Sequence, residues 1–147
     1  VLEKISRDFD AYFFIKTFGP FYGLVLYKAF ITEKTISLVK GRKEKKLYIF
    51  CSSILGKGIA KIIMDEGYSI KGFLDNNKAL ENISIFGINV STPSILMSMS
   101  ERELSEVFVI ICSDQESVTR EISVQLKEIG LKNEQIAHNT FNAKNLW

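Results

Sequence analysis

The segment "CSSILGKG", residues 51–58, combines small side chains, hydroxyls and a lysine directly after the apolar run "KLYIF". A small-residue loop between a strand and a helix lets backbone N–H groups approach phosphate oxygens, and the helix N-terminus adds the positive end of its dipole. Gly56 keeps this property, Ser52 and Ser53 can donate hydroxyl hydrogen bonds, and Lys57 can add charge. A loop that only turns the chain is the alternative.

The loop departs from the glycine pattern G-x-G-x-x-G of dinucleotide-binding proteins. That spacing aligns with Cys51, Ser53 and Gly56, so only the third position is glycine. A side chain at the first two positions is strained at positive φ and intrudes on the space of a pyrophosphate. The departure therefore weakens the prediction of tight dinucleotide binding.

Further polar residues follow two other predicted strands. Asp75 ends "YSIKGFLD", 17 to 19 residues beyond the loop glycines, near where an acid binds ribose hydroxyls. The sequence "DNN" is also turn chemistry, and both interpretations stay open. Ser113 and Asp114 follow "VFVIIC", where either could cap the next helix or form the polar edge of a ligand site. Carboxyl-end loops of one parallel sheet face the same crevice.

The elements that position these residues alternate along the chain. "KLYIF", "YSIKGFLD" and the buried run "VFVIIC" predict strands, and "ISIFGINV" predicts two short β pieces around Gly87. Helices are predicted over 55–67 and 117–130, each ending at a glycine, and after Ser91 or Thr92 as N-cap. "EQIAHNTF" can supply an edge strand. The order predicts an α/β fold with a doubly wound, mainly parallel sheet over 46–147.

Residues 1–45 differ from the rest and predict an aromatic-rich helical segment and a basic linker. Nine of the sixteen Phe and Tyr residues fall within the first thirty, and Lys16, Lys28 and the Gly19-Pro20 interruption argue against a transmembrane helix. We expect two short helices broken at Gly19-Pro20. They would pack on the main domain, on a second copy in a homo-oligomer, or on a neighbouring domain, through residues 1–39. We expect no membrane contact.

The composition limits the classes of partner and cofactor that the chain could bind. A net charge of +2 does not favour nucleic acid, and "KGRKEKK" at 40–46 is most simply a solvated linker. Cys51 and Cys112 lack metal-type spacing, which predicts a reduced pair and a cytoplasmic protein. His138 is the sole histidine and has no partner motif. The sequence therefore predicts neither a metal site nor catalytic residues.

The succession "GFLDNN…GINV…P" is the most specific part of a resemblance that covers roughly residues 46–137. It resembles the small Rossmann-like domains of bacterial surface-polysaccharide and nucleotide-sugar proteins. Such modules accompany a sugar acetyltransferase, a sugar methyltransferase or an FkbM-type methyltransferase. The resemblance implies a nucleotide or nucleotide-sugar ligand, or a recognition and scaffolding role. It places Ser52, Ser53, Leu55, Gly56 and Asp75 at ligand-facing positions.

The main functional prediction is a nucleotide or nucleotide-sugar binding module of a carbohydrate-pathway protein. Its site comprises Ser52, Ser53, Leu55, Gly56, Lys57, Asp75 and Ser113. The chain shows neither an acidic, glycine-rich S-adenosylmethionine loop nor hexapeptide repeats, so the chemistry of a parent transferase would lie outside it. Two alternatives are a degenerate domain for oligomerisation or docking, and an NAD(P)-dependent oxidoreductase.

Overall fold

The computed structural model describes residues 11–138, with side chains from Phe14 onward. It contains one six-stranded sheet in the order β3-β4-β2-β1-β5-β6, parallel except for the antiparallel β3–β4 pair. The predicted α/β class with a mainly parallel sheet is therefore confirmed. The described part of the chain leaves out some predicted features: the side chains of Phe9, Tyr12 and Phe13, and the last residues of the predicted strand 134–141.

The strands are β1 (Lys46–Phe50), β2 (Ile70–Leu74), β3 (Ser84–Ile85), β4 (Ile88–Ser91), β5 (Val107–Ile111) and β6 (Ile136–His138). The α-helices are α2 (Ala11–Phe18), α3 (Pro20–Val39), α4 (Ile54–Asp65), α5 (Ser94–Met97), α6 (Glu101–Ser105) and α7 (Glu116–Ile129). Two 3₁₀ turns, η1 (Lys78–Leu80) and η2 (Asn133–Gln135), complete the described chain.

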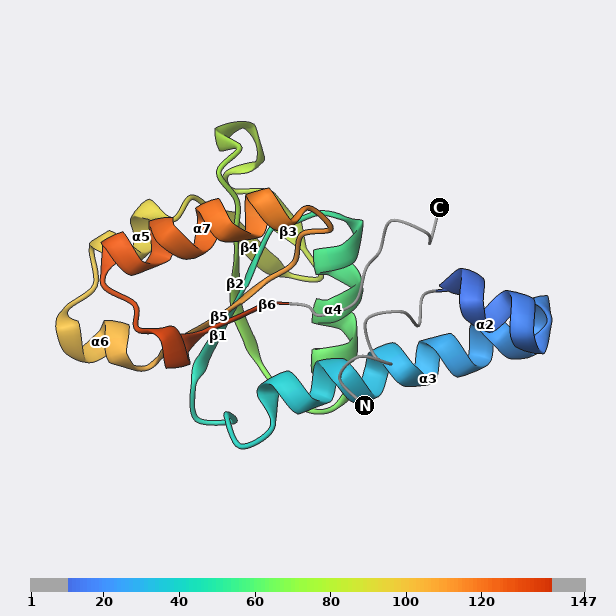
Figure 1. Cartoon of the computed structure of the whole chain (residues 1–147). Helices are drawn as coiled ribbons and strands as arrows, with labels where there is room; N and C mark the ends of the chain where they lie inside the picture. Colours follow the sequence, from blue (N-terminus) through green and yellow to red (C-terminus); the bar gives the residue numbers. More distant parts are fainter. Residues whose placement is uncertain (1–10, 139–147) are drawn as a thin grey trace.

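Helices cover both faces of the sheet and give a three-layer fold (Figure 1). On one face, α3 and α4 pack on alternate residues of the central strands, with Val39, Ile59 and Ile63 fully covered. On the other face, α5 and α7 pack through Leu96 and Leu126. Because both faces are covered, β5 is buried along its whole length, as its unbroken apolar run predicts.

The glycine signals for helix ends are confirmed, whereas the predicted N-cap of α5 is wrong. Gly67 takes positive φ directly after Glu66, the C-cap of α4, and Gly130 takes positive φ as the C-cap of α7. Pro93 occupies the N-cap of α5 in place of Ser91 or Thr92, because Ser91 still belongs to β4. A proline at that place fixes the entry angle but accepts no capping hydrogen bond from a side chain.

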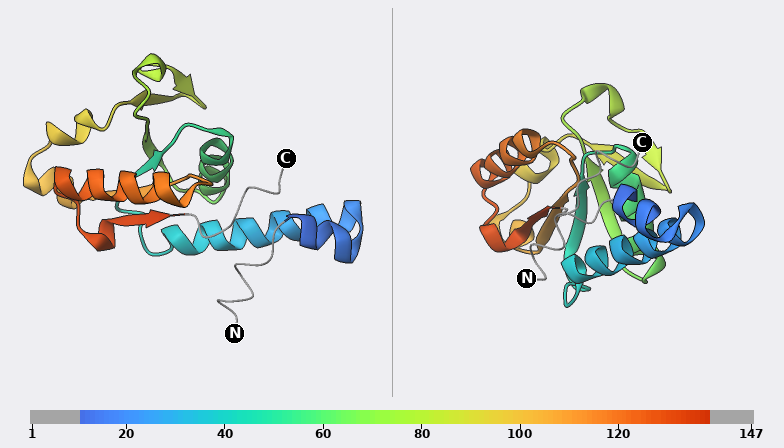
Figure 2. Two further views of the ribbon diagram at one scale, coloured as in Figure 1. Left: turned by 45° about the horizontal axis from the view of Figure 1, so that its top comes forward. Right: turned by 45° about the vertical axis from the view of Figure 1, so that its right-hand side comes forward.

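The N-terminal helices break at Gly19-Pro20 as predicted, but α3 is a 20-residue helix rather than a short one. It runs to Val39 and contacts α4, so its second half belongs to the packed core. The α2–α3 pair extends beyond the edge of the sheet in both views of Figure 2. Among residues 11–138, no helix combines the length and the apolar character needed to cross a bilayer.

Candidate functional site

The carboxyl ends of β1 and β5 form the centre of the candidate site. These two strands are neighbours in the sheet, yet the chain leaves β1 for α4 on one face and β5 for α7 on the other. This divergence is the topological switch point, where open α/β sheets bind ligands. A cavity of about 360 Å³ opens there, lined by Cys51, Ser53, Ile54, Leu55, Cys112, Ser113 and Asp114.

Cys51 occupies the place of the first glycine and adopts the left-handed conformation that glycine favours, with φ of 79°. A non-glycine residue there costs about 1–2 kcal/mol. The position is nevertheless well fixed, because the Cys51 N–H donates to the Leu74 carbonyl at 2.8 Å. The loop thus keeps the backbone course of a glycine loop although the residue is cysteine.

Gly56 is the one glycine of the pattern that the sequence retains, and its geometry explains why. A Cβ atom there would lie 2.0 Å from the backbone oxygen of Cys51. Such an approach is impossible for any residue with a side chain, so helix α4 starts against the loop only because position 56 is glycine. Gly56 is therefore buried and supports the site from below rather than lining the cavity.

The N-terminus of α4 brings backbone N–H donors to the cavity. Ser53 is its N-cap, and the Ser53 hydroxyl accepts a hydrogen bond from the Gly56 N–H at 3.4 Å. No acceptor within residues 11–138 receives the N–H of Ile54 or Leu55, and both residues line the cavity. Free N–H groups and the helix dipole together favour an anionic group at this point.

Asp75 holds the loop through hydrogen bonds within the chain. Its Oδ2 accepts from the Ser52 N–H at 3.0 Å and from the Ser52 hydroxyl at 2.8 Å. Its Oδ1 accepts from the Asn77 N–H at 2.9 Å, which is the turn expected from "DNN". Both oxygens therefore have partners in the chain, and neither Asp75 nor Ser52 lines the cavity.

The second loop brings Ser113 and Asp114 to the opposite wall. The prediction that one of them caps α7 is wrong, because Gln115 is the N-cap and no side chain makes the capping hydrogen bond. Instead, the Ser113 hydroxyl accepts from the Gln115 N–H at 3.1 Å, one residue before the helix. This local turn leaves the Asp114 side chain exposed at the cavity.

The two cysteines lie next to each other at the ends of β1 and β5 and are both free thiols, as the sequence predicts. Burial raises the pKa of Cys51 to about 11, with further contributions from the charges of Asp75 and Asp114. Burial also raises the pKa of Cys112 well above its usual value. Both groups are neutral thiols near pH 7 and contribute an uncharged wall.

The structure brings together only part of the predicted site. Ser53, Leu55 and Ser113 line one cavity, while Lys57 is exposed outside its lining. The predicted site left out four residues that line the cavity, although each lies next to a residue that it included: Cys51, Ile54, Cys112 and Asp114. The signal that could have found them is the rule that ligands contact the loops after neighbouring parallel strands.

The described residues hold no group of three or more His, Cys, Asp or Glu side chains that could bind a metal ion. His138, at the end of the edge strand β6, is exposed.

Comparison with known proteins reveals similarity in fold but not in family. No protein-family model and no curated protein matches the sequence. The Rex-family repressor RSP is 18% identical with a TM-score of 0.52, and the match covers 85% of this chain and 66% of that one. RSP in complex with β-NADH gives 16% identity, a TM-score of 0.51, and coverage of 85% and 65%.

A third solved structure, UDP-D-quinovosamine 4-dehydrogenase from Vibrio fischeri, is 20% identical with a TM-score of 0.43. That match covers 56% of this chain and 72% of the dehydrogenase. This chain spans about two thirds of the length of the RSP chains. At these identities the RSP matches establish one property. The fold is Rossmann-like.

Proposed function

We propose that this chain is a nucleotide-binding module whose ligand occupies the cavity between the β1–α4 and β5–α7 loops. The observation that carries the proposal is the pair of N–H groups of Ile54 and Leu55, on the N-terminus of α4 at the cavity, which have no acceptor within residues 11–138. A phosphate group is the natural acceptor for such donors. The opposite wall supplies a carboxylate, Asp114, which can accept hydrogen bonds from ribose hydroxyls.

The charge of the lining restricts the ligand. Among residues 11–138, Asp114 is the sole charged side chain of the lining, and no lysine or arginine of this range lines the cavity. The phosphate would therefore be held by uncharged donors, namely backbone N–H groups and the Ser53 hydroxyl, and by the helix dipole, which favours a diphosphate diester over a terminal phosphate with more charge. Nucleotide-sugars and dinucleotides both contain such a diester. A free nucleoside triphosphate fits poorly.

The finer proposal is a nucleotide-sugar, in a protein of surface-polysaccharide biosynthesis. Its support is the resemblance of "GFLDNN…GINV…P" to modules of that class. The reaction itself, a sugar methyl or acetyl transfer, would then lie in another part of the parent protein. NAD(H) is the second candidate, because the RSP repressor of similar fold has been solved with β-NADH.

Isothermal titration calorimetry with UDP-glucose, dTDP-glucose, NADH and ATP tests the proposal. We expect at least one diphosphate diester to bind and ATP to bind more weakly. Asp114→Ala should weaken that binding about tenfold, because it removes a charged hydrogen-bond acceptor. Asp65→Ala is the matched control, since Asp65 is an exposed carboxylate at the far end of α4.

Two results would overturn the proposal. The first is a folded chain that binds none of the four ligands at millimolar concentration. The second is equal binding by the Asp114→Ala and Asp65→Ala variants, which would place the ligand elsewhere on the molecule.

A further inference from the structure

The outer face of α3 presents a seam with coiled-coil spacing. Tyr22, Val25, Ala29, Thr32 and Ile36 are separated by steps of three, four, three and four residues. This alternation is the a/d repeat of the heptad, in which two helices pack against each other. Tyr22 and Val25 are exposed by 69% and 53%.

Among residues 11–138, the rest of the domain packs on the side of α3 that is opposite to the seam. Ile31 and Leu38 pack against the core, Tyr27 packs against Phe14 of α2, and at 100° per residue all three point about opposite to Ala29. Helix α2 also stays clear of the seam, because it contacts α3 closely at Gly23, where a Cβ would lie 2.5 Å from the Phe14 oxygen.

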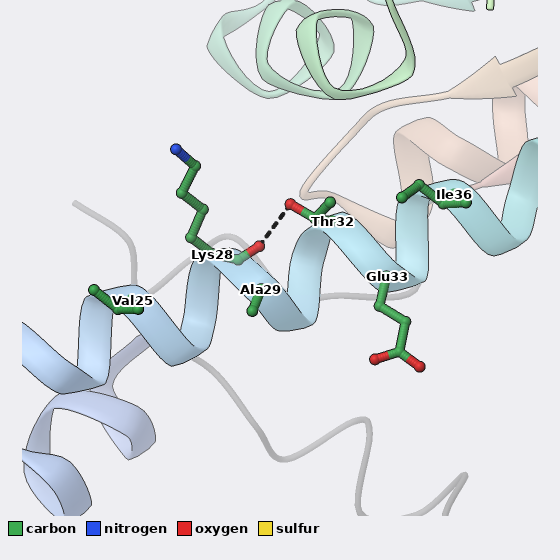
Figure 3. Close-up of a pocket in the computed structure, with 6 residues that line it drawn as sticks. All are labelled: Val25, Lys28, Ala29, Thr32, Glu33 and Ile36. Atoms are coloured by element: carbon green, nitrogen blue, oxygen red, sulfur yellow. Dashed lines mark hydrogen bonds between the residues drawn. The ribbon is translucent and has the colours of Figure 1, made fainter. Parts of the chain in front are cut away.

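The side chains at the centre of the seam, Ala29 and Thr32, are small, and neither needs a hydrogen bond from a partner. The Thr32 hydroxyl donates to the Lys28 carbonyl of its own helix at 2.8 Å, so covering Thr32 leaves no unpaired polar atom (Figure 3). With Ala29 beside it, the backbone of another helix can approach closely. Val25, Ala29, Thr32 and Ile36 line a shallow groove along α3.

The flanks of the seam carry complementary pairs five residues apart. Lys28 and Glu33 leave the helix on opposite sides (Figure 3), at the g and e positions of the heptad. Within residues 11–138 neither side chain has a salt-bridge partner. One heptad earlier, Phe21 and Leu26 occupy the same g and e positions, and their side chains are 73% and 41% exposed.

This spacing selects the direction of the partner helix. In a parallel, in-register pair, position g of one helix meets position e five residues later on the other. Lys28 then faces Glu33 of a second copy, and Phe21 faces its Leu26. In an antiparallel pair position g meets g and position e meets e, so Lys28 and Glu33 would not face each other. The pattern therefore complements a second copy of this helix.

We propose that α3 pairs in parallel with α3 of a second copy of the chain, through Tyr22, Val25, Ala29, Thr32 and Ile36. The exposed apolar residues at the seam and flanks offer on the order of 500 Å² per copy, so a pair buries about 1,000 Å², the lower end for a specific interface. A membrane surface is less suited, because apolar residues surround the first half of α3, whereas interfacial helices have one apolar and one charged face.

Sedimentation velocity over a range of concentrations tests the pairing. The chain should dimerise in the micromolar range, and Val25→Asp should abolish the dimer. Glu33→Lys should weaken it about tenfold, because two attractive contacts become repulsive. The double variant Lys28→Glu/Glu33→Lys should restore it. Glu128→Lys, the same change at an exposed position of α7, should leave it unaltered.

Circular dichroism should report an unchanged fold for these variants, since all the substituted side chains are exposed. A wild-type chain that stays monomeric at high micromolar concentration would overturn the proposal, whether or not it binds phosphatidylcholine vesicles. A double variant that dimerises as weakly as Glu33→Lys would overturn the parallel register.

Discussion

Two glycines of α4, two residues apart, should respond in opposite directions to the same substitution. Gly56→Ala places a methyl group 2.0 Å from the Cys51 carbonyl oxygen, a backbone atom that cannot rotate away. Gly58→Ala places the same group in open space, with no atom within 4 Å. The pair thus separates the close approach at the loop from the general effect of alanine in a helix.

The magnitudes follow from the contacts. To accept a methyl at position 56, α4 and the loop must separate by more than about 1 Å, and such overpacking costs about 1–3 kcal/mol. The movement also strains the hydrogen bonds from Ser52 to Asp75, each contributing about 1.5–3 kcal/mol when the acceptor is charged. The higher helix propensity of alanine offsets about 1 kcal/mol of this loss. We expect a net loss of about 2–4 kcal/mol.

Gly58→Ala should instead gain about 0.5–1 kcal/mol, because only the propensity term applies. Urea denaturation followed by circular dichroism measures both free energies of unfolding, and equal m-values would show that the unfolded states are comparable. A Gly56→Ala chain as stable as Gly58→Ala would refute the close packing of the Cys51 loop on α4.

Three further predictions concern the loop and the helical pair. Asp75→Ala should lower the free energy of unfolding, measured by urea denaturation, by about 2 kcal/mol, and Ser52→Ala should lower it by about 1 kcal/mol. The double variant should lose less than the sum, because the two residues share hydrogen bonds, and full additivity would contradict this. At pH 8, iodoacetamide should alkylate Cys51 roughly a hundredfold more slowly than an ordinary thiol, because burial raises the pKa of Cys51 to about 11. The reaction should accelerate as the pH rises toward that value. Mass spectrometry measures the alkylation rates of the native and unfolded chains, and equal rates would contradict the prediction. Gly23→Ala should separate α2 from α3 and speed tryptic cleavage after Lys16, and unchanged cleavage would contradict the close crossing.

Much of the fold could be predicted from the sequence because its local and global signals agree. The apolar run of β5 and the glycines at 67 and 130 gave correct strand and helix ends. Helix α6 was not predicted, because its five residues contain a single large apolar side chain, Leu104. Its capping box, Ser100 with Glu103, is a sequence signature that could have found it.

The candidate site was less predictable, because side-chain positions depend on hydrogen bonds that form only in three dimensions. Ser53 and Ser113 follow neighbouring strands, so topology alone places them together. Asp75 also follows a neighbouring strand, but the Ser52 backbone and hydroxyl occupy one of its oxygens. No sequence pattern specifies that competition, and the strain of Cys51 is likewise visible only in the loop conformation.

We propose above that a nucleotide phosphate binds at the N-terminus of α4. Amide correlation NMR spectra during titration with UDP-glucose or NADH test it most directly, since the proposed donors are themselves backbone N–H groups. We expect the largest chemical-shift changes at Ile54 and Leu55, with Ser113 also affected. Two results would contradict this binding site. In the first, the largest chemical-shift changes at saturating ligand occur on α3 or at the edge of the sheet, and in the second, neither ligand shifts any amide signal.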